Sequence, residues 1–170
     1  MLLRLNQIIE APGSVSFATT LDLHDMVIGA QTPATEPVQA SGIVRNVGGG
    51  EGVLQLTGEA RTTLHCQCDR CARAFDREYT VPLDAVLTTE IQEEEDEWTF
   101  LLEDDCADLD DIILTHFLFG LDMQLLCRED CAGLCPVCGK NLNDGPCGCN
   151  RKETDPRLAA LAQLLKEKTN

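Results

Sequence analysis

The segment CPVCGKNLNDGPCGC, residues 135–149, constrains the fold of this chain more than any other feature. Cys135 and Cys138 flank a short turn that ends in glycine, and Cys147 and Cys149 follow after a loop. A CxxC turn of this kind lets backbone amides point at two thiolates while both sulfurs reach one ion, and zinc takes four such ligands in a tetrahedron. The spacing therefore predicts a closed structural zinc site made of these four cysteines, with no coordination position left open for catalysis.

A second CxxC pair, Cys68 and Cys71, lies in HCQCDRCARAF at the end of a predicted strand and has no partner pair nearby. Cys127 and Cys131, in CREDCAGLC, form the other unassigned pair. These four thiols predict a second zinc site, which would join the sheet to the C-terminal module and restrict the unfolded chain. Other partitions remain open: Cys127 or Cys131 could replace a member of the first site, and Cys66 could replace Cys68.

Two cysteines, Cys66 and Cys106, are then left over, and we expect them to act as small hydrophobic residues. The metal is expected to be one or two Zn²⁺ ions. Iron is the less favoured alternative: CPVCG resembles the iron knuckle of rubredoxins, but the second pair is CxC. A thiol switch, in which oxidation releases the metal, is a further alternative. His65 adjoins Cys66 and could be a ligand, but a surface or core histidine is the favoured interpretation.

Ten cysteines in a chain without an export signal indicate a reducing compartment, where cysteines serve metals or redox chemistry more often than disulfides. The opening MLLRLNQIIE alternates apolar and polar residues, whereas a signal peptide needs an unbroken apolar region. No stretch is long and apolar enough to span a bilayer. The expected location is therefore the cytoplasm.

Short alternating segments rich in Val, Leu, Ile and Thr predict strands. They cover residues 2–9, 15–23, 38–47, 52–66 and 77–90. The glycines of 48–52 predict a hairpin connection, and residues 99–102 could pair as a short strand. Asp108 is a candidate N-cap, and after it Ile112, Ile113, Phe117 and Leu121 recur at helical spacing, which predicts a helix that covers the sheet.

A last helix is predicted over 155–168, because Asp155 can cap it and Pro156 suits its first turn. The fold class is therefore α+β: an antiparallel β-sheet or partly open barrel with a covering helix, a C-terminal zinc-ribbon-like cysteine module and a terminal helix. We expect a β-rich domain over 1–126, and a cysteine-rich zinc module with the C-terminal helix over 127–170.

The formal net charge is −16, which argues against a broad basic surface for nucleic acid. Residues 90–111 carry many carboxylates and no basic side chain, so this acidic segment is either simply solvated or a contact for a basic partner. Arg61, Arg70, Arg73 and Arg77 gather near the CxxC pair of Cys68 and Cys71, where they could contact RNA phosphate locally or balance nearby carboxylates.

The sequence contains no GxSxG, no phosphate-binding glycine loop and no HExxH, and its histidines are isolated. We therefore expect no enzymatic activity and no small-molecule substrate.

Four motifs follow one another between about Cys66 and Leu165: CDRCARAF, EDDCADLDDIIL, LCREDCAGLCPVCGKNLNDGPCGC and DPRLAALAQLL. Their succession resembles the cysteine-rich form of the YceD family, the large ribosomal RNA subunit accumulation proteins. The resemblance implies support for accumulation of large-subunit ribosomal RNA in bacteria and plastids. By the family's motif, Cys68, Arg70 and Cys71 belong to a central signature, and the six cysteines from Cys127 onward to the C-terminal form.

The resemblance and the charge together predict a non-catalytic factor for accumulation or assembly of the large subunit. Its expected partner is a basic ribosomal protein or an rRNA-processing factor, with at most a local contact to ribosomal RNA through Arg70, Arg73 and Arg77, and no membrane. Two alternatives from other classes are a metal-dependent RNA-processing enzyme and a redox-regulated zinc-binding chaperone.

Overall fold

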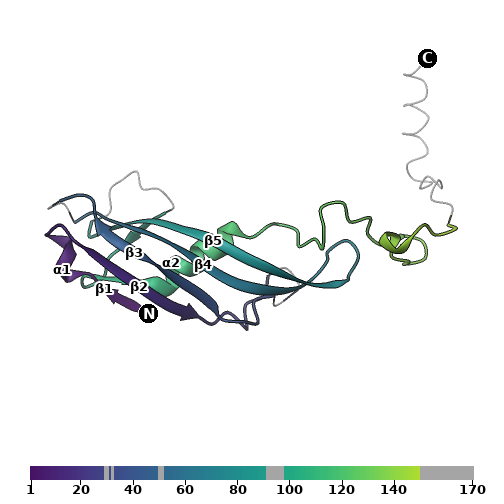
Figure 1. Ribbon diagram of the computed structural model, residues 1–170, viewed down its shortest axis with the longest axis horizontal. Helices are drawn as coiled ribbons and strands as arrows, with labels where there is room; N and C mark the ends of the chain where they lie inside the picture. The colour runs from purple at the N-terminus through teal and green to yellow at the C-terminus, as the bar shows by residue number, and fades with distance from the viewer. Residues whose placement is uncertain (29–30, 32, 50–51, 91–97, 150–170) are drawn as a thin grey trace, which may run out of the picture.

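The computed structural model describes residues 1–28, 31, 33–49, 52–90 and 98–149, and its main feature is one long, open sheet (Figure 1). Its strands, in spatial order, are β2 (Ser14–Leu21), β3 (Val38–Asn46), β4 (Leu54–Gln67), β5 (Ala74–Thr88) and β6 (Thr99–Leu101). Neighbouring strands run antiparallel except β5 and β6, which are parallel. A small second sheet pairs β1 (Leu2–Arg4) with β7 (Cys106–Asp108). The α+β class is confirmed, as an open mixed sheet and not a closed barrel.

Alternation of side chains in β4 decides which face of the sheet is buried. Leu54, Leu56, Ala60 and Leu64 are each at most 1% exposed, while the residues between them are glycine or polar and at least partly exposed. Successive residues of a strand point to opposite faces, so this period of two places every apolar side chain on the inner face.

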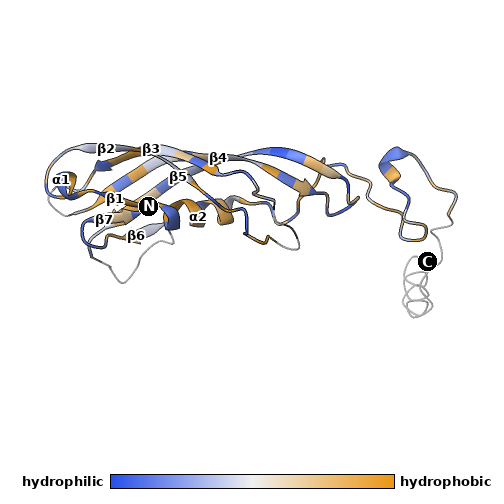
Figure 2. Ribbon diagram, turned by 90° about the horizontal axis from the view of Figure 1, so that it is seen from below, coloured by the Kyte–Doolittle hydropathy of each residue, from blue (hydrophilic) through white to orange (hydrophobic). Residues whose placement is uncertain are grey.

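Helix α2 (Leu109–Gly120) covers this inner face, as Figure 2 shows. The Asp108 carboxylate accepts a hydrogen bond from the Asp110 N–H at 3.0 Å, so the predicted N-cap is confirmed. Phe117 of α2 is fully buried and packs edge-on against Tyr79 of β5, with ring centroids 5.1 Å apart. The Tyr79 hydroxyl donates to the Phe117 carbonyl at 3.1 Å, which fixes the helix on the sheet.

The outer edge of β5 is closed by three different devices. Pro82 offers no N–H to a further strand. The Asp84 N–H donates to Nε2 of His116 on α2 at 3.2 Å, and the Val86 N–H donates to the Trp98 carbonyl at 3.0 Å. Nδ1 of His116 lies 2.8 Å from the Ile112 carbonyl, so both ring nitrogens of this buried histidine are engaged. This edge is thereby protected from pairing with another chain.

The N-terminal segment differs from its prediction. Residues 2–9 were expected as one strand, but they form β1 followed by the short helix α1 (Asn6–Ile9). Leu5, Ile8 and Ile9 are buried at a spacing of three and four residues, which only a helical turn can direct to one side.

The other predicted strands are present within a few residues of their expected ends. The short strand at 99–102 is also confirmed, although it joins β5 in parallel and makes the sheet mixed. The predicted helix 155–168 and residues 91–97 of the acidic segment lie outside the described residues. Within the described part of the chain, no helix has the length and hydrophobicity needed to cross a membrane. The division at 126/127 stays a prediction.

Candidate metal centres

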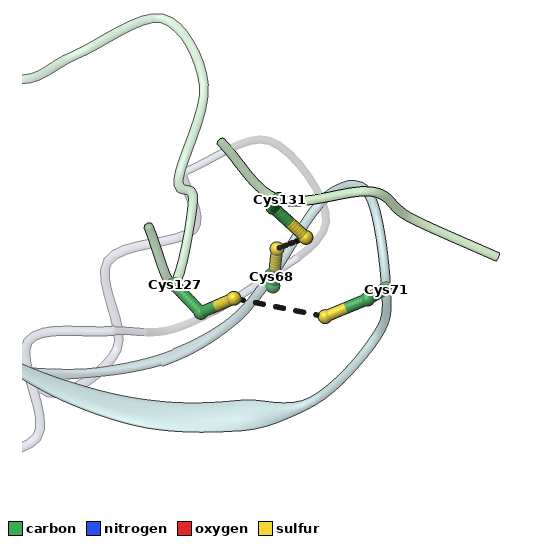
Figure 3. Close-up of side chains that lie close together, drawn as sticks. All are labelled: Cys68, Cys71, Cys127 and Cys131. Carbon is green, nitrogen blue, oxygen red and sulfur yellow. Dashed lines mark hydrogen bonds between the residues drawn. The ribbon is translucent and has the colours of Figure 1, made fainter. Parts of the chain in front are cut away.

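The turn between β4 and β5 carries Cys68 and Cys71, and the chain after α2 returns to it with Cys127 and Cys131 (Figure 3). We call these four residues the hairpin cluster. Their sulfurs all lie within 4.8 Å of one another, and the Cys68–Cys131 and Cys71–Cys127 Sγ distances are both 3.7 Å. Four sulfurs placed tetrahedrally around zinc are about 3.8 Å apart, whereas a disulfide needs about 2.0 Å. The arrangement fits one thiolate-bound metal ion.

Cys135, Cys138, Cys147 and Cys149 form a second group, the C-terminal cluster, whose sulfurs also lie within 4.8 Å of one another. It lies beyond the tip of the β4–β5 hairpin, around the 3-10 turn η1 (Leu142–Asp144), which is yellow-green in Figure 1. The structure thus brings together the same two groups of four that the sequence singled out. Either group could hold a metal ion, and that these residues do bind metal stays a prediction.

The two CxxC turns have the same backbone geometry. In each, the residue after the second cysteine donates its N–H to the carbonyl of the first cysteine: Ala72 to Cys68 at 2.8 Å, and Gly139 to Cys135 at 2.9 Å. Ala72 and Gly139 both have left-handed backbones, with φ of 55° and 71°. This turn directs the intervening amides toward the first sulfur, as the CxxC spacing predicted.

Those amides favour a thiolate on the first cysteine of each turn. Burial opposes ionisation of Cys68, but the N–H groups of Cys127, Arg70 and Cys71 together lower its pKa to about 6. The N–H groups of Cys138 and Val137 lower the pKa of Cys135 in the same way. The hydrogen bond from Asn143 lowers the pKa of Cys131 as well, so each cluster presents at least one readily ionised sulfur, the form that binds a metal.

Each cluster also holds one thiol that strongly retains its proton. Burial, and then hydrogen bonds with Cys68 and Cys71, raise the pKa of Cys127 to about 12. A hydrogen bond with Cys138, and then burial, raise the pKa of Cys149 to about 12. Four sulfurs in one site cannot all ionise together without a cation, so metal binding at either cluster would release protons.

Asn143 connects the clusters and was missed by the sequence analysis. It lies in the loop between the two cysteine pairs of the C-terminal cluster, yet its Nδ2 donates to Sγ of Cys131 in the hairpin cluster at 3.3 Å. Its Oδ1 accepts from the Ala132 N–H at 2.9 Å and from Nη2 of Arg128 at 2.6 Å. Nothing in the sequence marks a loop asparagine as a hydrogen-bond donor to a sulfur of a different cluster, so only the fold reveals this contact.

The three arginines expected near RNA already have partners in this chain. Arg70 donates to the carbonyls of Cys131 and Glu129, Arg73 pairs with Asp144 at 2.6 Å, and Arg77 pairs with Asp122 at 2.7 Å. Arg70 and Arg73 thus bind the hairpin turn to the loops of the two clusters. A contact with RNA through these side chains stays a prediction.

The remaining candidates lie apart from both clusters. Cys66 is 3% exposed inside the hydrophobic core, where burial raises the pKa of its thiol. Cys106 belongs to β7. Nδ1 of His65 lies 2.7 Å from the Asp76 carboxylate at the surface, so this histidine pairs with an acid.

Comparison with known proteins gives one family. The model of the family described as large ribosomal RNA subunit accumulation protein YceD matches residues 56–165. An uncharacterized protein of Mycobacterium tuberculosis (strain H37Rv) is 33% identical over 120 residues, covering 68% of this chain and 56% of that protein. The large ribosomal RNA subunit accumulation protein YCED homolog 1, chloroplastic, of Arabidopsis thaliana is 28% identical over 168 residues, covering 79% of this chain and 50% of that protein.

The matches thus span only about half the length of these relatives, 56% and 50%. The uncharacterized protein YlbN of Bacillus subtilis is 35% identical over 74 residues, 43% of each chain. No solved structure matches this chain.

Proposed function

Since this chain belongs to the YceD family of large ribosomal RNA subunit accumulation proteins, we propose that it supports the accumulation of large-subunit ribosomal RNA as a non-catalytic factor. The observation that carries the proposal is the family match over 56–165, which includes β5, α2 and both cysteine clusters. The name of the Arabidopsis relative gives the same role for that protein.

We assign structural zinc to both clusters. Four sulfurs fill the tetrahedral coordination that zinc prefers, which supports a structural role over that of a metal-dependent RNA-processing enzyme. Zinc in the hairpin cluster would fasten the segment after α2 to the β4–β5 hairpin. Inductively coupled plasma mass spectrometry of the purified protein should find two zinc ions per chain. Iron in place of zinc, visible as absorption bands of iron thiolate, would contradict the assignment.

The partner we propose is a basic protein, either a ribosomal protein or an rRNA-processing factor. The formal net charge of −16 attracts basic proteins and disfavours wide contact with RNA phosphates. Binding to a basic protein would explain an effect on ribosomal RNA without requiring this chain to contact the RNA widely.

The decisive experiment depletes the protein in its host and measures the ratio of large-subunit to small-subunit ribosomal RNA, together with the precursor ends of the large RNA. A selective fall of the large-subunit RNA, restored by the wild-type gene, is the expected result. An unchanged ratio with normal precursor ends would refute the proposed function.

The exposed thiol of Cys138 favours one second candidate, a redox-regulated zinc-binding chaperone, because an oxidant can reach this side of the C-terminal cluster. Mild peroxide would then release zinc and switch on the binding of unfolded client proteins. Full retention of zinc under peroxide would remove this candidate without affecting the first.

A further inference from the structure

An aromatic hollow lies between the outer edge of β5 and the C-terminal end of α2. Its volume is about 450 Å³. The Trp98 ring lies 4.5 Å from His116 and 5.4 Å from Phe119, measured between centroids, and the Phe119 ring is steeply inclined to it at 69°. Pro82 and Asp84 of β5 contribute to the lining from the sheet. The hollow thus brings two aromatic rings together beside one acidic residue of the sheet, Asp84.

The apolar residues at this end of α2 are exposed, in contrast to the rest of the helix. Phe119 is 64% exposed and Leu118 is 45% exposed, whereas Ile113 and Phe117 are fully buried in the core. A large aromatic side chain left half in water beside a tryptophan is typical of a surface that contacts another molecule.

Charge indicates what that molecule is. Asp84 is the charged residue of the lining, and no lysine or arginine lines the hollow. Its carboxylate lies on the solvent face of the sheet, where it accepts from Nε2 of Gln55 on β4 at 3.2 Å and keeps further lone pairs for a donor that reaches over the edge of β5. A guanidinium stacks on aromatic faces and pairs with a carboxylate at the same time, and an ammonium does the former less well.

We propose that the aromatic hollow is the docking site for an arginine-rich segment of a basic partner protein, with one guanidinium seated against Trp98 and Phe119 and paired with Asp84. The inference rests on the proposed function in that the partner is taken to be a protein. Cation–π attraction and the carboxylate together select arginine over neutral side chains at this position.

Trp98 is the chain's one tryptophan, so its fluorescence reports directly on the hollow. The full chain, loaded with zinc, is titrated with a peptide of alternating arginine and glycine, and with the same peptide carrying citrulline, which keeps the shape of arginine without its charge. The arginine peptide should shift the Trp98 emission saturably, and the citrulline peptide should bind at least about tenfold more weakly.

Variants separate this site from general attraction to an acidic protein. Phe119→Ala should weaken the arginine peptide about three- to tenfold, measured by calorimetry, and Asp84→Asn should weaken it comparably. Val47→Ala removes an equally solvent-facing side chain, 58% exposed, at the end of β3 and should leave the affinity unchanged. Circular dichroism checks that all three variants are folded.

Four outcomes would overturn the docking site: equal affinity for both peptides, equal affinity of Phe119→Ala and Val47→Ala, tighter Phe119-dependent binding of a single-stranded RNA dodecamer, or a dimer of the chain that Phe119→Ala dissociates. The depletion experiment tests the proposed function independently of the docking site. If depletion leaves ribosomal RNA unchanged while the peptide binds as expected, the proposed function is wrong and the docking site stands. If depletion lowers the large-subunit RNA but Phe119→Ala binds the arginine peptide normally, the docking site is wrong and the proposed function stands.

Discussion

Alanine in one metal-ligand turn occupies the backbone position that glycine occupies in the other. Ala72 has a φ of 55°, a region that costs a residue with a side chain roughly 1–2 kcal/mol, and Gly139 has a φ of 71°. Ala72→Gly relieves this strain but also increases the conformational entropy of the unfolded chain, which offsets part of the gain. We therefore expect it to raise the free energy of unfolding by up to about 1 kcal/mol. Gly139→Ala should lower it by about 1 kcal/mol. Chemical denaturation with zinc present measures both, and a destabilising Ala72→Gly would contradict the shared geometry.

The amide of Asn143 is expected to control the metal affinity of the hairpin cluster. Asn143→Ala removes the hydrogen bond to Sγ of Cys131, and loss of such an outer contact typically costs 10- to 100-fold in affinity. Competition with a chelator should show the loss at the hairpin cluster. Lys140→Ala is the matched control, because Lys140 lies in the same loop and its ammonium donates to the Pro146 carbonyl, away from the hairpin cluster. Equal affinities of the two variants would show that Asn143 does not act on the metal.

His65 should titrate above the ordinary histidine range. The hydrogen bond with Asp76 raises its pKa, and burial opposes this only in part. The protonated ring is thus favoured in the folded state, so its stabilising effect is present below about pH 6.5 and is lost as the pH rises through the raised pKa. NMR titration should show the His65 pKa falling toward its usual value in Asp76→Asn. Asp22→Asn, which removes the acid beside His24, should leave His65 unchanged.

At the scale of elements, β3 and β4 face each other at a pair of glycines. Gly42 faces Gly58 across the strands, and a Cβ on either would lie 2.4 Å or 2.3 Å from a carbonyl oxygen of the neighbouring strand. Phe17 of β2 covers the gap, 2.9 Å from a Cβ on Gly42. Gly42→Ala should lower the free energy of unfolding by about 1–3 kcal/mol through overpacking. Thermal unfolding measures it; Gly49→Ala, where a Cβ meets nothing but φ is +66°, reports instead the cost of a left-handed backbone without overpacking.

The sequence predicted the elements whose side chains alternate over many residues. Strand β4 spans 14 residues and β5 spans 15, so a shift of one residue would expose a whole apolar face. Helix α1 was missed, because a single turn buries Leu5, Ile8 and Ile9 within a segment that also alternates. The parallel direction of β6 depends on where the chain crosses over after β5, and no residue of Thr99–Leu101 specifies that route.

At the scale of the whole molecule, the sheet and the cysteine-rich segment have separate cores. The large core contains the sheet and α2, with Cys66 as its one cysteine, whereas Cys68, Cys71 and Cys131 form a small cluster of their own. CxxC spacing identified the C-terminal cluster directly. The hairpin cluster followed only from pairing the cysteines that remained, since its halves lie far apart in the chain.

Metal removal should therefore loosen one part of the molecule and spare the other. After chelation, we expect hydrogen exchange to accelerate across 123–149 and at the β4–β5 turn, while the centres of β3 and β4 stay protected by the large core. Zinc should restore the protection. Uniform loss of protection across the sheet would show that the metal sites hold the entire fold together.

The wide separation of the hairpin cysteines in the chain also determines when each metal site can form during translation. A ribosome delivers Cys68 early and Cys131 only 63 residues later, whereas Cys135 to Cys149 emerge almost together. During that interval the thiols of Cys68 and Cys71 in the β4–β5 turn have no partner cysteines. Any protection of these two thiols from oxidation or from an incorrect metal must therefore act during translation, before Cys127 and Cys131 can complete the site.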